Sequence, residues 1–263
     1  MPAILIDDLH DPRLDVFRHI KKSNATRAGL FIAEGQKLVE LLLGNGIPLH
    51  SLLVDPQHLE IVKDRVPSDL PLLVVAHSDI EQLVGFNFHR GMLACGFRPA
   101  NPSLAALIEP VETPRRIVVC PSIQDPENLG AVIRIGCAFG IDGLILGPSS
   151  ADPYSRRVLR VSMGNAFQLP IYSSSDLALD ITQLERAQFE LIATVLDDSA
   201  EPLSTFRPAK RWAMLVGNEG HGLEPAWIVR AHRRVTIPMH QGVDSLNVSV
   251  ATGILLYQFS QIS

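Results

Sequence analysis

Apolar residues recur at two different spacings along the second half of the chain, and the two spacings alternate. Short apolar runs that are typical of buried strands lie at 116–120, 143–146, 190–195, 212–216 and 235–237. Segments with apolar residues on one helical face lie at 128–139, 177–187 and 246–259. Strands separated by helices predict a parallel sheet covered on both faces. Because such sheets bind ligands at the carboxyl ends of their strands, the loops there are where we expect function.

The first half shows the same mixture in shorter segments. Helical patterns cover 33–43 and 78–83, and the second opens with Ser78 followed three residues later by Glu81, a helix-capping signal. Strand patterns lie at 49–54, 72–75 and 92–97. We therefore expect a small α/β domain over residues 1–98.

A proline-rich stretch separates the two halves. Residues 99–114 contain four prolines, which interrupt regular structure and stiffen connections. We interpret 99–114 as a linker with at most one short helix, followed by a second domain over 115–263.

Composition and charge narrow the class of protein. The chain has 263 residues, of which 46% are apolar and 19% charged, as in globular domains. The net charge of −5 excludes a highly basic nucleic-acid coat protein, but an RNA enzyme needs only local positive patches. The sequence lacks an apolar stretch long enough to span a membrane and a secretory signal pattern, so we expect a cytoplasmic protein. Cys95, Cys120 and Cys137 are expected to be buried free thiols.

The first unusual loop, at 125–134, follows a predicted strand and opens a predicted helix. Asn128 is a good N-cap residue, and Gly130 permits close approach of a backbone or a ligand. Arg134 stands between two isoleucines on an otherwise apolar helix. On its own the loop is equally explained as an ordinary capped helix.

The second loop, at 215–223, contains Gly217, Gly220 and Gly222 directly after a strand. The glycines supply free backbone N–H groups and space, but their spacing matches neither common nucleotide-binding motif. Glu219 between them disfavours a phosphate ligand and favours a neutral or cationic one. Taken alone, the loop is also consistent with a simple tight turn.

The third loop runs from Ile237 to a predicted C-terminal helix and places Ser245 and Asn247 near the helix start. Ser245 is interpreted as a capping residue first, because no GxSxG motif or His–Asp pair marks it as a hydrolase nucleophile. The histidines form no metal-binding pattern, so we expect no metal.

Together, in this order, the three loops resemble one family. The set N-x-G-x-x-x-R, G-N-E-G-x-G-L and I-P-M…S-L-N-V-S-x-A resembles the SpoU (TrmH-like) branch of the SPOUT RNA methyltransferases, over residues 115–260. Residues 31–35, 38–39 and 89–91 resemble the substrate-binding domain often fused in front, an RNA-binding fold of the ribosomal-protein L30e/L7Ae type. The chain departs from the usual pattern at Arg90, often Gln, and at Ile135-Gly136, more commonly Thr-Ala.

The resemblance implies an α/β fold whose C-terminal segment forms a deep trefoil knot that holds S-adenosylmethionine, usually in a homodimer. Residues matching the cofactor site are Gly217, Asn218, Ile237, Met239 and Leu246. Residues matching the catalytic site are Arg134, Asn128, Glu219, Ser245 and Asn247. The implied reaction methylates a ribose 2′-hydroxyl of tRNA or rRNA.

Arg134 matches the family's catalytic arginine, which is often described as a base. A guanidinium is not normally deprotonated in proteins, so we expect Arg134 to bind the adjacent phosphate and to stabilise charge on the ribose oxygen. Glu219 is expected to orient Arg134 or the cationic end of the cofactor. The alternative function is an RNA-binding or ribosome-assembly protein that has lost catalysis, and a base-methylating enzyme of the same superfamily is less favoured.

RNA binding needs a positive surface, and 18 of the 23 basic residues are arginines, which match phosphate geometry well. The predicted RNA-binding residues are Arg156, Arg157, Arg160, Lys21, Lys22 and Arg27.

Overall fold

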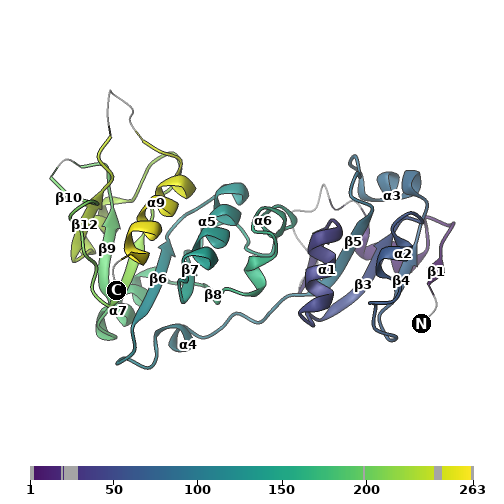
Figure 1. Ribbon diagram of the computed structural model, residues 1–263, viewed down its shortest axis with the longest axis horizontal. Coiled ribbons are helices and arrows are strands. Elements are labelled where there is room, and N and C mark those ends of the chain that lie inside the picture. Colours follow the sequence, from purple (N-terminus) through teal and green to yellow (C-terminus); the bar gives the residue numbers. More distant parts are fainter. Residues whose placement is uncertain (1–2, 19, 21–28, 198, 240–244, 262–263) are drawn as a thin grey trace. The chain divides into compact units, whose positions relative to one another are not determined.

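The computed structural model describes residues 3–18, 20, 29–197, 199–239 and 245–261 (Figure 1). The chain forms two compact units. The first comprises Met1–Pro99 together with Tyr154–Gly164, and the second comprises Ala100–Pro153 together with Asn165–Ser263. The segment Tyr154–Gly164 was expected in the second domain. The chain instead returns to the first unit for this segment and then re-enters the second unit at Asn165.

Among the described residues of the first unit, five strands form one sheet. Their order is β1 (Ile4–Leu5), β4 (Leu72–Val74), β3 (Leu49–Val54), β5 (Met92–Phe97) and β2 (Leu30–Glu34). Strands β1 to β4 run in one direction, and β5 is antiparallel to both of its neighbours. The carboxyl ends of β1 to β4 therefore meet the amino end of β5 at one edge of the sheet.

Helices cover this first sheet. They are η1 (Pro12–Phe17), α1 (Gln36–Gly44), α2 (Leu59–Val62), α3 (His77–Val84) and α6 (Arg156–Val161). Leu14 and Phe17 of η1 are buried in the same cluster as Leu53 of β3 and Leu73 of β4. Helix α6 packs against β2, which lies at the edge of the sheet, so this edge strand is protected.

The second unit contains a seven-stranded sheet that is parallel throughout the described residues. Its order is β10 (Glu201–Pro202), β12 (Arg233–Thr236), β9 (Glu190–Thr194), β11 (Arg211–Leu215), β6 (Arg115–Cys120), β7 (Gly143–Leu146) and β8 (Ile171–Ser173). The predicted parallel sheet is confirmed.

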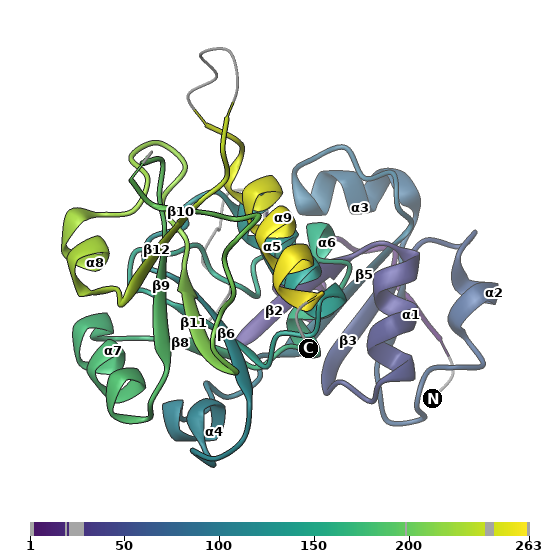
Figure 2. The same ribbon diagram turned by 60° about the vertical axis from the view of Figure 1, so that its left-hand side comes forward.

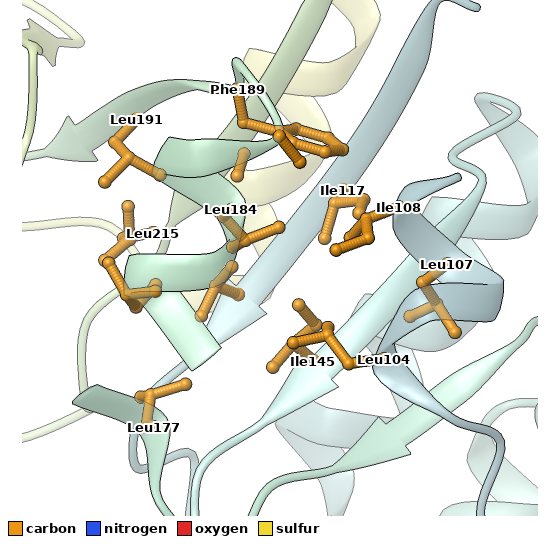
Figure 3. Packing of buried hydrophobic residues seen from close by; sticks show 14 of the residues in the cluster. Leu104, Leu107, Ile108, Ile117, Ile145, Leu177, Leu184, Phe189, Leu191 and Leu215 are labelled. Carbon is orange, nitrogen blue, oxygen red and sulfur yellow. The ribbon is translucent and has the colours of Figure 1, made fainter. Parts of the chain in front are cut away.

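Both faces of the second sheet are covered, as the continuous apolar runs of its strands require. The helices of this unit are α4 (Leu104–Ile108), α5 (Pro126–Ala138), η2 (Asn165–Phe167), α7 (Leu177–Arg186), α8 (Pro225–Arg230) and α9 (Val248–Ser260). Side chains from α4 and α7 share one core cluster with alternate strand residues such as Ile117 and Leu215 (Figure 3), and Trp227 and Ile228 of α8 pack against this cluster. Trp212 faces the other way and packs edge-on against Phe259 of α9, which lies beside α5 (Figure 2).

The expected linker is part of the second unit. Ser103 caps α4 by accepting a hydrogen bond from the backbone N–H of Ala106. Leu104, Leu107 and Ile108, spaced i, i+3 and i+4, are buried in the core cluster. The prolines mark the ends of this helix rather than an independent connection.

Several helix starts differ from the prediction. The first helix begins at Gln36, because Ala33 and Glu34 belong to β2. Helix α3 begins at His77 after Ala76, so Ser78 does not cap it. Helix α5 begins at Pro126 with Asp125 as its N-cap, and Asn128 lies in its first turn. Proline is favoured at the first helical position, so the helix starts at Pro126, two residues before the predicted start.

No helix in the described part of the chain is long and apolar enough to cross a membrane. Cys95 and Cys120 are buried free thiols as expected, whereas Cys137 is only half-buried. Burial raises the pKa of the Cys120 thiol far above its ordinary value, and the nearby Glu219 carboxylate raises it further.

Candidate functional site

A cleft of about 580 Å³ lies where β9, β11 and β12 end. Its volume falls within the range of roughly 300–1,000 Å³ that small-molecule sites occupy. Eight of the ten predicted catalytic and cofactor-binding residues line it: Gly217, Asn218, Glu219, Ile237, Met239, Ser245, Leu246 and Asn247. The second and third sequence motifs therefore form one site at the carboxyl edge of the sheet.

The glycine-rich loop after β11 closes on itself. The backbones of Asn218 and Gly222 exchange two hydrogen bonds of 2.8 and 3.0 Å. A Cβ atom at Gly217 would lie 2.4 Å from the backbone of Gly222 and Leu223, so only glycine fits there. The Asn218 side chain donates to the carbonyl oxygen of Ser122 at 2.8 Å and accepts from the N–H of Gly220 at 2.9 Å. The loop is thus a rigid wall of the cleft.

Three polar side chains, one from each motif, form a continuous hydrogen-bond network. The Asn247 amide donates to Oδ1 of Asn128 at 2.9 Å, and the Asn128 amide donates to Oε1 of Glu219 at 3.2 Å. Glu219 also accepts from the backbone N–H of Asp125 at 3.1 Å. Asn128 is 8% exposed and does not line the cleft. It supports Glu219 and Asn247, which do line the cleft, through the hydrogen bonds it makes with them.

The polarity of this network is fixed at both ends. A carboxylate only accepts, so Asn128 must present its amide nitrogen to Glu219 and its oxygen to Asn247. Asn247 then presents its own oxygen to the start of α9, where it accepts from the N–H of Ser249 at 2.9 Å. Asn247, rather than the expected Ser245, is the N-cap of α9, and Ser245 is an exposed residue of the cleft wall.

Arg134 is exposed on α5 and makes no hydrogen bond or ion pair with any residue that the structure describes. Glu219 bonds to Asn128 and to the backbone at the start of α5 and makes no hydrogen bond or ion pair with Arg134 among the described residues, so its expected role in orienting Arg134 or the cationic end of the cofactor stays a prediction. The guanidinium remains available for a ligand.

Sequence reasoning missed a further wall of the cleft, formed by the end of β9 and the segment after it. It contributes Thr194, Val195, Leu196 and Asp197. The hydrogen bond from the backbone N–H of Ser199 lowers the pKa of Asp197, and the charge of Arg234 adds to the effect. The signal that was available is the position of this segment at the carboxyl end of a parallel strand next to β11.

The predicted RNA-binding arginines belong to the first unit. Arg156 pairs with the buried carboxylate of Glu34, and its guanidinium lies 4.1 Å from the centre of the Phe86 ring. Arg157 is exposed and Arg160 is half-buried on the same short helix. Lys21, Lys22 and Arg27 lie outside the described residues. A role of all six residues in RNA binding stays a prediction.

Within the described ranges no group of three or more His, Cys, Asp or Glu side chains is placed to hold a metal ion.

Comparison with known proteins identifies the family. The family model described as the SpoU rRNA Methylase family matches residues 115–257. An uncharacterised tRNA/rRNA methyltransferase of Mycobacterium tuberculosis is 33% identical over 260 residues, which cover 95% of this chain and 89% of that protein. The 23S rRNA (guanosine(2553)-2′-O)-methyltransferase RlmP of Bacillus subtilis is 28% identical and covers 91% of both chains.

Solved structures give the same result. The AdoMet-bound rRNA methyltransferase from Sinorhizobium meliloti superposes with a TM-score of 0.84 at 26% identity, over 98% of each chain. The SpoU methyltransferase AviRb from Streptomyces viridochromogenes in complex with AdoMet gives a TM-score of 0.80 at 25% identity, over 95% of this chain and 97% of that one. The chain belongs to the SpoU rRNA methylase family, which confirms the resemblance found in the sequence.

Proposed function

We propose that the cleft binds S-adenosylmethionine and that the chain transfers its methyl group to a ribose 2′-hydroxyl of RNA. The observation that carries the proposal is the convergence of the second and third family motifs on one cleft, with Asn128 of the first motif bonded to both. Family membership and the AdoMet-bound relatives confirm this function and this cofactor as the class predicted from sequence.

The cleft fits the cofactor chemically. Leu223, Ile237 and Leu246 supply apolar surface for the adenine ring, while backbone groups of the loop at Gly217 supply hydrogen bonds. The close approach that requires glycine at 217 keeps those backbone groups open to a ligand. When bound, the cofactor supplies an electrophilic methyl group on a sulfonium centre.

Arg134 is the residue we assign to the acceptor side. It is an exposed cation on α5 with no hydrogen-bond or ion-pair partner in the described part of the chain, and the first turn of α5 carries Asn128. A guanidinium stays protonated, so Arg134 acts by holding the phosphate beside the target ribose and by stabilising negative charge on the attacking oxygen. The network of Asn247, Asn128 and Glu219 keeps the start of α5 in place against the cleft.

Ribosomal RNA is the acceptor that we propose. Two relatives carry names that specify 23S rRNA: RlmP of Bacillus subtilis and the guanosine-2′-O-methyltransferase RlmB of Acinetobacter baylyi. The first unit is proposed to bind the RNA through a fold of the ribosomal-protein type. Cytoplasmic location remains a prediction.

The trefoil knot is the arrangement that we propose for the C-terminal segment. Helix α8, before β12, packs in the core cluster on one face of the sheet, whereas α9, after β12, packs with Trp212 on the other. The chain thus crosses from one face to the other at the cleft, beside the closed loop 217–222. We propose that the C-terminal segment forms the knot at this edge, where the second and third motifs meet.

A homodimer through α9 is the assembly that we propose. Val250, Ile254 and Tyr257 lie on one face of α9 and are 50%, 39% and 55% exposed. An apolar stripe of this kind is typical of a surface that a partner covers. Sedimentation of the wild-type protein as a dimer, and of an Ile254→Glu variant as a monomer, tests the proposal.

Cofactor titration and methyl transfer test the function itself. Calorimetry should show one S-adenosylmethionine per chain, and radiolabel from the cofactor should enter rRNA prepared from a strain that lacks this gene. Alkaline hydrolysis should leave the labelled dinucleotide intact, since a 2′-O-methyl group blocks cleavage. A protein that binds this RNA but not the cofactor is instead the non-catalytic RNA-binding protein that the sequence left open.

A further inference from the structure

The first unit gathers basic side chains at the edge where four of its strands end. Glu34 is the last residue of β2, Asp55 follows β3, and His77 starts the helix after β4. Gly91 immediately precedes β5, which runs the other way. Residues far apart in the sequence are therefore neighbours at this edge.

Two buried carboxylates organise the edge, and each holds two basic side chains. Asp55 is 1% exposed and accepts from Nδ1 of His58 at 2.6 Å and from Nδ1 of His77 at 2.9 Å. Glu34 is 5% exposed, pairs with Arg156 and lies 3.9 Å from Nε of Arg90. We call His58, His77, Arg90 and Arg156 the basic edge.

The two halves of the basic edge are in contact through the backbone at Gly91. A Cβ atom at Gly91 would lie 2.0 Å from the His58 ring, so the imidazole rests directly on this glycine. Arg90 is the preceding residue, and a Cβ at Gly35 would lie 3.2 Å from its side chain. The N–H of Asp55 donates to the carbonyl of Gly91 at 3.1 Å. The edge is a fixed surface rather than a group of independent side chains.

The carboxylates of this surface are buried, and basic side chains are exposed on it. Each carboxylate is covered, whereas the side chains of Arg90 and His77 are 51% and 47% exposed. A carboxylate only accepts, so each histidine donates from Nδ1 and turns Nε2 away from Asp55. Fixed cations and imidazole nitrogens in a row suit a chain of phosphates and ribose hydroxyls better than a single small anion.

We propose that the basic edge binds the phosphate backbone of the RNA substrate, with Arg90 and His77 as its exposed contacts. The proposal rests on the proposed function for the identity of the polyanion. It places the RNA contact of the first unit at residues that the basic clusters of the sequence did not include, namely Arg90, His58 and His77. Glu34 and Asp55 are positioning residues, because they hold the basic groups and do not face the ligand.

The test measures binding of the full-length protein to deproteinised rRNA from a strain lacking this gene, at several salt concentrations and without cofactor. Arg90→Gln should weaken binding at least threefold and reduce the slope of log K against log salt by about 0.7–0.9, the value for one lost phosphate contact. Adding His77→Gln to this variant should weaken binding further, and Arg90→Lys should restore the slope.

Matched controls come from the same unit. Arg65 is an exposed arginine paired with Glu40, and His50 is an exposed histidine near the opposite end of β3. Arg65→Gln and His50→Gln should bind like wild type, and melting curves should show that all variants are folded. Wild-type affinity and slope in the Arg90→Gln/His77→Gln variant, or equal losses in the controls, would overturn the proposal.

Calorimetry with S-adenosylmethionine on the same variants separates this proposal from the function. The described residues that line the cleft all belong to the second unit, so the variants should bind the cofactor with wild-type affinity. If wild type fails to bind the cofactor, the proposed function fails, while a loss of RNA binding at Arg90 still supports the basic edge.

Discussion

The side-chain nitrogen of Asn247 lies 2.9 Å from Oδ1 of Asn128 and so connects the N-cap of α9 to the first turn of α5. These residues are 119 positions apart in the sequence. Asn247 has two separate tasks, since its oxygen caps α9 and its nitrogen reaches Asn128. Different substitutions can separate the two tasks.

Asn247→Asp should keep the cap and break the bridge. An aspartate oxygen still accepts from the start of α9, but no N–H remains to donate to Asn128. We expect at least a tenfold loss of methyl transfer with a free energy of unfolding near that of wild type. Asn247→Ala removes the cap as well and should lower the free energy of unfolding by about 1 kcal/mol. Urea unfolding measures the free energy of unfolding, and initial rates measure methyl transfer. Equal activity of Asn247→Asp and wild type would show that the bridge has no catalytic role.

The close approach at Gly217 gives a second prediction. A methyl group there meets backbone atoms of Gly222 and Leu223 at 2.4 Å, and backbone cannot turn aside as a side chain can. Gly217→Ala should open the loop and abolish measurable cofactor binding. Gly220→Ala is the matched control, because its nearest contact is Oδ1 of Asn218 at 3.7 Å. Calorimetry that gives the two variants similar affinities would exclude the loop as a cofactor wall.

Arg134 should affect rate and not stability. Its guanidinium is exposed and unpaired among the described residues, so Arg134→Gln should unfold like wild type and bind the cofactor normally. Methyl transfer should fall at least a hundredfold, in line with the loss of one preorganised donor to a developing oxyanion. Arg134→Lys keeps the charge but not the planar fork, and near-full activity with an unchanged pH profile would exclude a special role of the guanidinium.

Much of the fold and of the site was accessible from the sequence because it is encoded locally. The apolar runs of the second sheet and the glycines after β11 are local patterns, which can be recognised without knowing which distant segments they contact. The motif order then predicted eight residues of the cleft wall. The cap positions were misjudged because competing signals lie close together: Asp125 precedes Pro126, and Asn247 follows Ser245 by two residues.

The rest depended on contacts between distant segments. Glu34 and Arg156 are 122 positions apart, and no pattern in either segment shows that Tyr154–Gly164 joins the first unit. Likewise, no sequence pattern links Asp55, His58 and His77, which the sheet order brings to one edge. These residues are neighbours because of the sheet topology, which the periodicity of the sequence does not reveal.

The buried side chain of Arg211 is expected to stabilise the second unit by binding the backbone at the end of α4 and after it. The side chain is 7% exposed, stacks on Phe189 and donates to carbonyl oxygens that include those of Pro110 and Thr113, at 3.0 and 2.7 Å. Burial lowers the pKa of Arg211, and the charge of Arg115 lowers it further. Arg211→Leu leaves these carbonyls unpaired and should cost about 2–4 kcal/mol.

Trp212 fluorescence during urea unfolding measures the effect of Arg211→Leu, since the indole belongs to the next residue of β11. Arg207→Leu is the matched control. Arg207 is an exposed arginine that donates to the nearby carbonyls of Ser204 and Phe206, and its removal should change stability by less than about 0.5 kcal/mol. Similar losses in the two variants would show that burial of Arg211 contributes nothing specific.

The contacts of Asp55 give a prediction for how the stability of the first unit changes as the pH falls. Burial alone raises the pKa of Asp55, but the hydrogen bonds from His58 and His77 and the charge of His58 together bring it below its ordinary value of 3.8. A carboxyl group whose pKa is lowered on folding stabilises the folded state above the unfolded-state pKa, and this stabilisation is lost as the pH falls through the folded-state pKa. Amide exchange of β3, followed from pH 6 down to pH 3, should therefore show a loss of protection in wild type below about pH 4. Asp55→Asn should be less protected at pH 6 and should lose less on acidification. If the two proteins lost protection in parallel, the ionised Asp55 would not be what holds this edge together.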